Sequence, residues 1–377
     1  MTELKQNENV TFRILKGTPD ILQTGNKLLF LLTAPLKVLY QIWTLWATLA
    51  YQSPTCEWML VQNPPSIPTL LLTILICRIK GTKLVIDWHN FGFTILALKL
   101  GEGHPLVAIS KHYEVLFARF AQYHFTVTDA MRDVLQSELG ITRPIFTLHD
   151  RPAPIFRPVA LQDRAAQLVK QPLTAAEAPE ILDNRTRLVV SSTSWTPDED
   201  FSVLLEALCK YSASAISDSP QLPELLVVIT GKGPMRDQYL SKIKQLEDDQ
   251  DLEMITIKTD WLSFEDYANL LATADLGVSL HTSSSGVDLP MKVVDMFGAG
   301  LPVLGYNDYK AWSELVTEDV NGKGFVNAQD MADIFKQLFD PLTTTLPALK
   351  DGALRESTNR WEAEWDAVAG RLFGYGT

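Results

Sequence analysis

One stretch, from Leu276 to Val303, constrains the fold more than any other, because it contains every part of a β–α–β unit. Alternating apolar residues up to Leu280 predict a buried strand, and a polar loop with the sequence HTSSSGVD follows directly. A helical pattern then begins at Pro290, and a second apolar strand begins at Pro302. Strands joined by a helix in this way lie parallel in one sheet, so the stretch predicts an α/β fold.

The loop inside this unit has the features of a phosphate-binding site. Backbone N–H groups in the turn from Ser283 to Gly286 can point at an anion, and the N-terminus of the next helix adds partial positive charge. Lys292, in the first turn of that helix, adds a full positive charge. Asp288 and Asp295 can bind ribose or sugar hydroxyls, although Asp288 can also be an N-cap and Asp295 a solvated or packing residue. We therefore expect a phosphorylated ligand, most simply a nucleotide.

Composition and charge exclude several classes of partner. The chain has 377 residues, enough for two domains, and a net charge of −12. That charge argues against nucleic acid as a partner, and against binding to anionic lipid by charge alone. The three cysteines are odd in number and widely spaced, which does not suit a disulfide framework. No CxxC or HxxxH spacing predicts a zinc site, and we assign no metal and no cofactor.

An apolar segment near the N-terminus raises the question of a membrane. The first twenty residues are polar and do not resemble a signal peptide. The segment from Leu28 to Tyr51 is long enough to cross a bilayer, but it contains Pro35 and Lys37, and its aromatic residues lie in its second half. It can be a core helix or a helix on the membrane surface. We expect it to touch the bilayer without crossing it.

The pattern of strands and helices predicts two α/β domains with a break between them. Residues 1–160 and 187–340 each alternate short apolar runs with helical patterns. Residues 151–187 shift in composition, with five prolines among Ala and Gln, which predicts a linker over residues 161–186. Residues 341–377 predict C-terminal helices.

Further polar loops follow predicted strands in both domains. Ser192–Trp195 and Gly231–Gly233 follow strands of the second domain; each alone predicts no more than capping or a tight turn. However, these two loops and the loop from Ser283 to Gly286, called the serine loop below, all follow strands of one predicted parallel sheet. They therefore share its carboxyl edge, where doubly wound folds bind ligands. In the first domain, Asp87 and His89 end a strand and are candidates for a general base, although a single His is usually structural.

These residues resemble one family over most of the chain. The blocks are VQNPPSIP, KLVIDWHNFGF, SSTSWTPDEDFSVLLEAL, ITGKGP and ADLGVSLHTSSSGVDLPMKVVDMFGAGLPV, and they look like those of the chitobiosyldiphosphodolichol β-mannosyltransferases. The resemblance implies a GT-B fold, with two Rossmann-like domains facing a cleft, on the cytosolic face of the endoplasmic reticulum membrane. It also implies transfer of mannose from GDP-mannose, in β-1,4 linkage and with inversion, to GlcNAc2-diphosphodolichol. This is the first mannosylation in lipid-linked oligosaccharide synthesis for protein N-glycosylation, and other mannosyltransferases of the pathway are expected partners.

The resemblance also assigns roles to residues. It places Asp87 and His89 on the acceptor side as catalytic candidates. It places the nucleotide sugar on Ser192, Thr193, Ser194, Trp195, Gly231, Lys232, Gly233, His281, Ser283, Ser284, Ser285, Gly286, Asp288, Lys292 and Asp295. Many retaining relatives have a Glu where this chain has Val287, which fits an inverting enzyme.

Two alternatives stay open at this point. Family members usually begin with a membrane anchor, a strand and a Gly/Arg loop, and we expect the first domain here to be incomplete at its start. The chain can therefore also be a shortened, non-catalytic homologue that binds sugar nucleotide. Another sugar-nucleotide enzyme with two Rossmann-like domains, such as an epimerase, agrees less well with the dense match.

Overall fold

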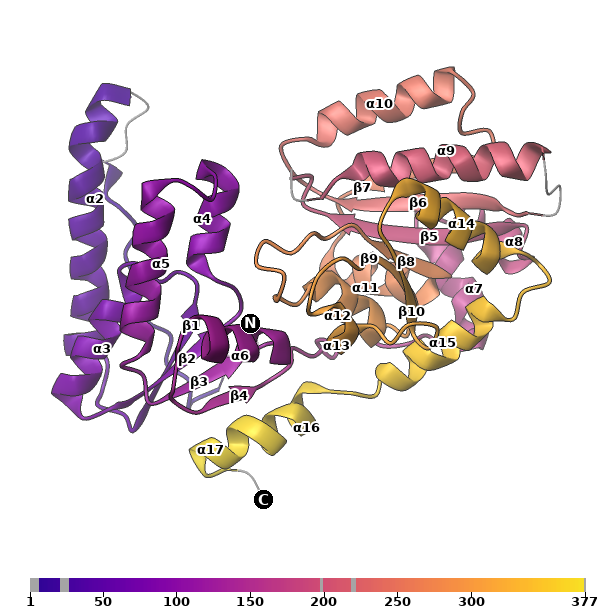
Figure 1. Ribbon diagram of the computed structural model, residues 1–377. Helices are drawn as coiled ribbons and strands as arrows, with labels where there is room; N and C mark the ends of the chain where they lie inside the picture. The colour runs from indigo at the N-terminus through magenta and orange to yellow at the C-terminus, as the bar shows by residue number, and fades with distance from the viewer. Residues whose placement is uncertain (1–6, 21–26, 197–198, 218–221, 376–377) are drawn as a thin grey trace. The chain divides into compact units, whose positions relative to one another are not determined.

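The computed structural model describes residues 7–20, 27–196, 199–217 and 222–375, and it separates into two units, each with its own parallel sheet (Figure 1). The N-terminal unit comprises Met1–Thr126 and Arg132–Phe146, and the C-terminal unit comprises Val127–Met131 and Thr147–Thr377. The predicted α/β class is therefore confirmed. Along the chain, the boundary between the units lies near residue 146 rather than at residue 160. The segment Val127–Met131, which includes the start of α6 (Asp129–Asp133), also belongs to the C-terminal unit.

The N-terminal unit has a four-stranded sheet in the order β1-β2-β3-β4. Its strands are β1 (Trp58–Asn63), β2 (Lys83–Trp88), β3 (Tyr123–Thr126) and β4 (Ile145–Thr147); its helical segments, besides α6, are α2 (Lys27–Ala47), η2 (Thr48–Gln52), α3 (Thr69–Lys80), α4 (Gly92–Leu100), α5 (Pro105–Ala118) and η3 (Val134–Glu138). Asn63 pairs with Trp88, and Trp88 pairs with Thr126. The carboxyl ends of the first three strands are therefore level, and the loops after them share one edge.

The apolar segment near the N-terminus forms helix α2 and the π-helical turn η2. Lys80 anchors the turn by donating hydrogen bonds to two backbone oxygens of residues 49–53, both at 2.7 Å. The side chains of residues 27–32 lie outside the described residues, but farther along the helix Leu39 and Trp43 are 60% and 61% exposed. The described half of α2 is therefore not a core helix. In the part of the chain that the structure describes, no helix has both the length and the apolar character needed to cross a membrane.

The C-terminal unit has a six-stranded parallel sheet in the order β10-β9-β8-β5-β6-β7. Its strands are β5 (Thr186–Thr193), β6 (Glu224–Gly231), β7 (Ile255–Asp260), β8 (Leu276–Ser279), β9 (Val303–Tyr306) and β10 (Gly322–Phe325). This is the strand order of a Rossmann fold, in which successive strands are added first on one side of the first strand and then, from the fourth strand on, on its other side. Those strands are β5 and β8 here, and their carboxyl ends are the expected ligand site.

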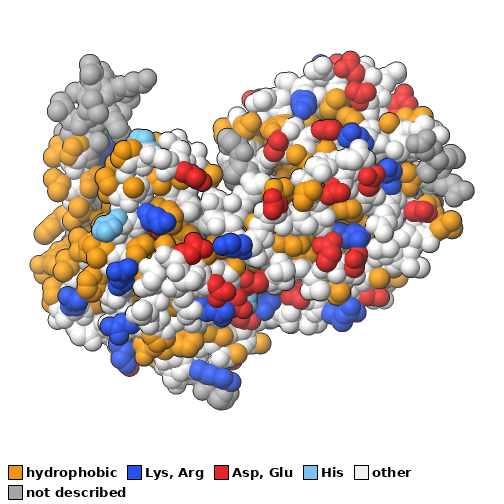
Figure 2. Space-filling view, in the orientation of Figure 1, with side chains coloured by type: hydrophobic (Ala, Val, Ile, Leu, Met, Phe, Trp, Pro, Cys, Tyr) orange, Lys and Arg blue, Asp and Glu red, His pale blue; other side chains and the backbone are white. Residues whose placement is uncertain are grey.

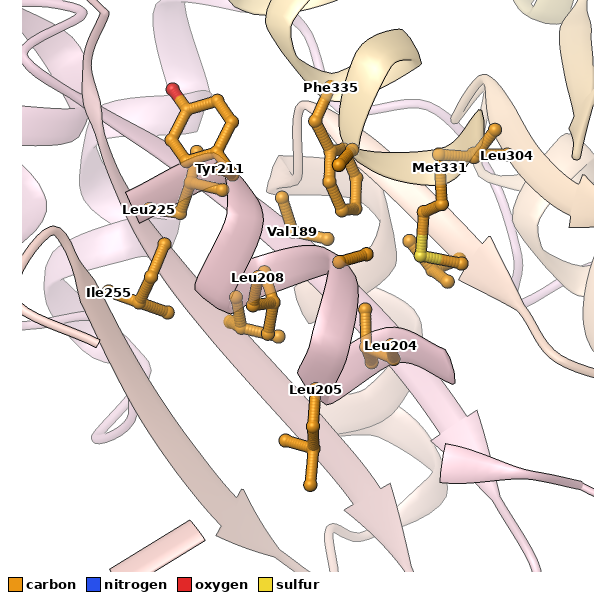
Figure 3. Close-up of a cluster of buried hydrophobic side chains, with 14 of the residues drawn as sticks. Val189, Leu204, Leu205, Leu208, Tyr211, Leu225, Ile255, Leu304, Met331 and Phe335 are labelled. Carbon is orange, nitrogen blue, oxygen red and sulfur yellow. The ribbon is translucent and has the colours of Figure 1, made fainter. Parts of the chain in front are cut away.

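Both faces of this sheet are covered by helices. On one face, α9 (Phe201–Ser217) and α14 (Ala328–Phe339) pack Leu204, Leu208 and Phe335 against Val189 (Figure 3). On the other, α11 (Phe264–Thr273) and α12 (Met291–Gly298) cover the neighbouring strand residue Val190. Because successive strand residues point to opposite faces, a run of apolar residues in β5 fills two cores at once. Each fully buried Leu, Val or Phe side chain stabilises the unit by about 1.5–3 kcal/mol.

The structure differs from the predicted linker at residues 161–186. This stretch contains α7 (Leu161–Lys170) and α8 (Ala178–Leu182), which belong to the C-terminal unit. Leu168 and Ile181 are 0% exposed and join the second core. In α8 the proline gave a false signal, because Pro179 stands in the first turn, where its missing N–H is tolerated. Beyond α14, the chain continues into the predicted C-terminal helices α15 (Thr345–Glu356), α16 (Trp361–Trp365) and α17 (Arg371–Phe373).

Candidate active site

A cavity of 350 Å³ opens at the carboxyl ends of β5 and β6, beside α12. It brings together six of the predicted residues and their neighbour Thr230 with three residues of the β7–α11 connection and two of α11 itself. The lining residues are Ser192, Thr193, Ser194, Thr230, Gly231, Trp261, Leu262, Ser263, Phe264, Tyr267, Lys292 and Asp295. Residues from three separate strand ends therefore converge on one space.

Two glycines let the loop after β6 lie directly against the end of β5. A Cβ added to Gly231 would stand 1.8 Å from the backbone oxygen of Thr193, and one added to Gly233 would stand 1.7 Å from that of Ser194. Gly231 also has a positive φ of 151°, which side chains rarely adopt. The pattern Gly-Lys-Gly is therefore a requirement of close backbone packing at the cavity, whatever the ligand.

Lys292 in α12 forms an ion pair with Glu199, a residue that the sequence interpretation did not place in the site. The Glu199 side chain is 2% exposed, and it also accepts hydrogen bonds from the Thr193 hydroxyl at 2.7 Å and from the Ser194 N–H at 2.8 Å. Thr196 and Glu199 have the Thr-x-x-Glu spacing of a capping box, which predicts a helix that starts there. Instead α9 begins at Phe201, and residues 197–198 lie outside the described residues. The Glu199 carboxylate thus holds both the Lys292 ammonium and the end of β5, at Thr193 and Ser194.

Asp295 lines the cavity, and no ion pair links it to a cationic side chain among the described residues. Burial raises the pKa of Asp295 to about 7, so that both protonation states are populated near neutral pH. Burial also raises the pKa of the neighbouring Tyr267 phenol, whose oxygen lies 2.8 Å from the Ser192 hydroxyl. These three residues can donate hydrogen bonds to a ligand oxygen or accept them from a ligand hydroxyl.

Two exposed aromatic residues lie at the same cavity. Trp261 and Phe264 are each 59% exposed and both line the cavity, so they present apolar surface to it. The Lys232 ammonium lies 4.7 Å from the centre of the Trp261 ring. An aromatic face beside cations suits a planar heterocycle attached to phosphate. The sequence interpretation missed both residues, although two aromatics separated by Leu-Ser after a strand could have identified them.

The serine loop is shaped by Asp288. Its carboxylate accepts hydrogen bonds from the hydroxyl of Ser283, from His281 Nε2 at 3.1 Å and from the Ser285 hydroxyl at 3.1 Å. Burial alone would raise the pKa of Asp288, but these hydrogen bonds and the His281 charge outweigh burial and lower it. Asp288 is not the N-cap of α12: that position is Pro290, and it makes no side-chain capping bond.

The loop itself lines a different cavity from the one at β5 and β6. Ser283, Ser285 and Gly286 border a space of 670 Å³ together with Tyr306 and Lys310, among others. The predicted phosphate loop and Lys292 are thus not brought together in one cavity. Thr128 supports the loop from behind, since its hydroxyl donates to the Val287 backbone oxygen at 2.6 Å.

Trp195 occupies the core rather than either cavity. Its side chain is 1% exposed, its ring packs on Phe201 and Tyr239, and its Nε1 donates to the Gly231 backbone oxygen at 3.2 Å. The indole therefore holds the loops in place and does not face a ligand.

In the N-terminal unit, Asp87 and His89 lie at the carboxyl end of β2, as predicted. His89 Nε2 lies 3.0 Å from Asp87 Oδ2, and both side chains remain partly exposed.

The buried residue Glu114 in α5 holds the loops beside this pair. It is 0% exposed, and its carboxylate accepts hydrogen bonds from Asn63 at 2.5 Å and from the N–H of Gly92 at 3.1 Å. Burial raises the pKa of Glu114 despite these bonds. Glu114 ties the loops after β1 and β2 together, and no local sequence pattern indicated it.

One trio of described residues has the composition of a metal site. Ligand atoms of Asp129, His149 and Glu314 lie within 4.8 Å of one another. Each group already has a protein partner: Glu314 accepts from the N–H groups of Asp129 and Ala130, and the His149 ring lies 3.3 Å from both Glu314 and Glu364. The two carboxylates raise the pKa of His149 to about 9, so the imidazole is protonated and repels a cation.

Sequence comparison finds relatives over nearly the whole chain. A chitobiosyldiphosphodolichol beta-mannosyltransferase of Arthroderma benhamiae is 52% identical over 374 residues, which cover 99% of this chain and 83% of that protein. A protein of the same name from Yarrowia lipolytica is 44% identical, covering 95% of this chain and 75% of the relative. A protein of Arabidopsis thaliana named UDP-glycosyltransferase TURAN is 38% identical, covering 93% and 83%. No protein-family model matches the chain.

Solved structures resemble the fold at low sequence identity. The Anabaena protein HepE in complex with UDP is 16% identical, with a TM-score of 0.65 over 90% of this chain and 82% of that one. A glycosyltransferase from Rickettsia africae is 13% identical, with a TM-score of 0.62 over 99% and 86%. The likeness confirms the predicted GT-B fold.

Proposed function

The chain belongs to the family of chitobiosyldiphosphodolichol beta-mannosyltransferases, and from this premise we propose that it transfers mannose from GDP-mannose, in β-1,4 linkage and with inversion, to GlcNAc2-diphosphodolichol. As a member of this family it is an enzyme, a glycosyltransferase. The observation that carries the choice of site is the cavity at β5 and β6, where glycine-lined backbone, Lys292 and an exposed aromatic residue converge.

The donor is assigned to this cavity on the basis of its chemistry. A nucleoside diphosphate needs a platform for its base and cations for its phosphates; Trp261 offers the first, and Lys232 and Lys292 offer the second. Glu199 keeps the Lys292 ammonium in place before the donor binds. Asp295, with its pKa raised to about 7 by burial, is suited to contact a sugar hydroxyl in either protonation state.

The acceptor is assigned to the N-terminal unit, with Asp87 and His89 as the proton acceptors. In an inverting transfer the acceptor oxygen forms its bond to the anomeric carbon as the bond from that carbon to the GDP oxygen breaks. The proton of the acceptor hydroxyl must then pass to a base. The 3.0 Å contact between Asp87 and His89 supports this role, because a carboxylate that holds one ring nitrogen orients the imidazole and stabilises its protonated form.

We further propose that the N-terminal unit lies on a membrane, at the cytosolic face of the endoplasmic reticulum. Helix α4 is strongly apolar, yet none of its residues, all of which are described, is buried. Ile95 and Leu98 in α4, with Leu106 and Ile109 in α5, are 36–60% exposed. Figure 2 shows many hydrophobic side chains on the surface of this unit. Such a surface fits an acyl-chain or polyprenyl environment.

Incubating the purified chain with lipid-linked chitobiose diphosphate and a panel of donors tests the proposal. The panel comprises GDP-mannose, UDP-glucose and UDP-N-acetylglucosamine, because one relative is named a UDP-glycosyltransferase. We expect GDP-mannose to be consumed with formation of one mannosylated lipid. Consumption of a UDP-sugar in preference to GDP-mannose would contradict the donor assignment, and release of free mannose without a lipid product would contradict the acceptor assignment.

A further inference from the structure

A second cavity, of 390 Å³, lies in the C-terminal unit at the opposite edge of the sheet from the candidate donor site. It borders Arg187 at the start of β5, Asp275 just before β8 and Lys350 in α15. Its volume is within the range of small-molecule sites, which is roughly 300–1,000 Å³. Neither the family resemblance nor the proposed transfer reaction uses these residues.

Three cations surround a single inner carboxylate in this cavity. Asp275 accepts a hydrogen bond from Arg164 at 2.8 Å and one from the Leu188 N–H at 2.8 Å, while Arg187 lies 3.9 Å away. One carboxylate cannot neutralise Arg164, Arg187 and Lys350 together. The other acidic side chain at the cavity, Asp340, is exposed at the rim and accepts from the backbone of Leu342. The inner end of the cavity is therefore positively charged.

Two of these cations have hydrogen-bond donors to spare. The Arg187 Nε is buried and has no hydrogen-bond partner among the described residues. The Lys350 ammonium has three donors, yet in the described part of the chain it makes a single long bond, 3.5 Å to the Ala274 backbone oxygen. Burial, with a smaller contribution from the like charge of Arg164, lowers the pKa of Lys350 to about 8, even though Asp275 opposes the shift. Buried donors without partners are rare in proteins and commonly mark a site for a water, ion or ligand.

The remaining wall of the cavity is apolar. Val159, Leu346 and Leu354 line it, together with Pro158 and Pro347. From this combination we propose that the cavity binds a small amphipathic anion, with a phosphate or carboxylate head on Lys350 and Arg187 and a short alkyl body against the prolines and leucines. The ligand need not be a nucleotide, since the described lining contains no aromatic face that could stack a base.

Isothermal titration with four simple probes tests this proposal. The probes are hexyl phosphate, hexanoate, inorganic phosphate and hexanol. We expect saturable binding of hexyl phosphate or hexanoate, at least tenfold tighter than inorganic phosphate or hexanol, because head and body both contribute. The stronger of the two amphiphiles identifies the head group. Equal affinity for hexanol would show that the cations take no part, and equal affinity for inorganic phosphate would show that the apolar wall takes none; either result overturns the proposal.

Three variants locate the bound probe. Lys350→Met keeps the apolar stem and should weaken binding of the amphiphile tenfold or more, while Lys350→Arg should restore most of it. Lys292→Ala, at the donor cavity, should leave binding unchanged. Lys244→Met, at an exposed lysine of α10 (Arg236–Asp248), serves as the control for a lost surface charge.

A second readout keeps the test independent of folding. A bound anion stabilises the charged form of Lys350, so saturating amphiphile should slow acetylation of Lys350 at pH 8, measured by mass spectrometry, in the wild-type protein. Unchanged Lys350 acetylation, or binding lost in Lys292→Ala but kept in Lys350→Met, would overturn the proposal.

Discussion

Lys292 and Glu199 are 93 residues apart in the chain and form an ion pair beside the cavity at the ends of β5 and β6, where the Glu199 side chain is 2% exposed. A buried carboxylate whose hydrogen bonds hold a strand end and whose charge holds a lysine is well placed to keep that lysine ready for an anion.

Replacing Lys292 with Ala should weaken binding of GDP. A charge-assisted hydrogen bond contributes about 1.5–3 kcal/mol, which corresponds to roughly 10- to 150-fold in affinity. Calorimetric titration of GDP against both forms measures the loss, with thermal unfolding as a check that Glu199, left without its cation, has not disrupted the unit. Lys310→Ala is the matched control, because Lys310 lines the neighbouring cavity at the serine loop. Unchanged affinity in Lys292→Ala with a loss in Lys310→Ala would move the diphosphate to that second cavity.

Asp87→Asn and His89→Ala should each reduce turnover while leaving GDP binding intact. Loss of general-base assistance lowers rates by about 100- to 10,000-fold. The measurement is mannose transfer at saturating donor, and His112→Ala, an exposed histidine on α5, is the control. If both variants turn over within a few-fold of wild type, neither residue is the base. A larger effect in Asp87→Asn than in His89→Ala would assign the proton to the carboxylate.

The exposed apolar residues of α4 and α5 should anchor the protein to lipid. Leu98 and Ile109 are each 60% exposed, and burying one such side chain fully contributes about 1.5–3 kcal/mol. The double variant Leu98→Ser/Ile109→Ser should therefore weaken binding to phosphatidylcholine vesicles about tenfold or more in flotation experiments. Val169→Ser, at a 61% exposed valine of the C-terminal unit, should have no effect. If vesicle binding weakened equally in the two variants, α4 and α5 would have no special role in binding lipid.

His149 should make the C-terminal unit less stable at alkaline pH. Its pKa is raised from 6.5 to about 9 by Glu314 and Glu364, so its contribution to stability is fully present below pH 6.5 and is lost as pH rises through 9. Arg151, which bonds Glu364 at 3.0 Å, opposes the shift through its like charge. The contribution is at most on the order of 3 kcal/mol.

Urea unfolding of wild type and His149→Gln at pH 6 and pH 9.5 measures this contribution. The difference between the two proteins should be large at pH 6 and small at pH 9.5. An equal difference at both values would show that His149 acts only through packing.

The sequence predicted the parts of the site that depend on local pattern. The ends of β2, β5, β6 and β8 were located because an apolar run followed by polar residues is a local signal, and parallel strands must place such ends on one edge. The residues that organise those loops were missed. Glu199 and Glu114 act through partners far away in the chain, and Glu199 had a simpler local explanation as part of a capping box.

The sequence interpretation also grouped residues that the structure separates. Trp195 follows the end of β5 and was assigned to the ligand, but its indole fills the core against Phe201. The serine loop and Lys292 are close in sequence, yet Asp288 draws the loop's hydroxyls toward itself and the loop lines another cavity. In both cases the direction in which the side chains point decides whether a residue lines the cavity. The order of residues in the sequence does not specify that direction.

The stereochemistry and identity of the transfer product test the central claim most directly. The purified chain is incubated with GDP-mannose and lipid-linked chitobiose diphosphate, and the released trisaccharide is treated with β-mannosidase or α-mannosidase. We predict one mannose per acceptor, removed by the β-specific enzyme alone, with product formation reduced at subsaturating donor in Lys292→Ala. A product cleaved by α-mannosidase, or no mannosylated product from a folded chain that binds GDP, would contradict the account.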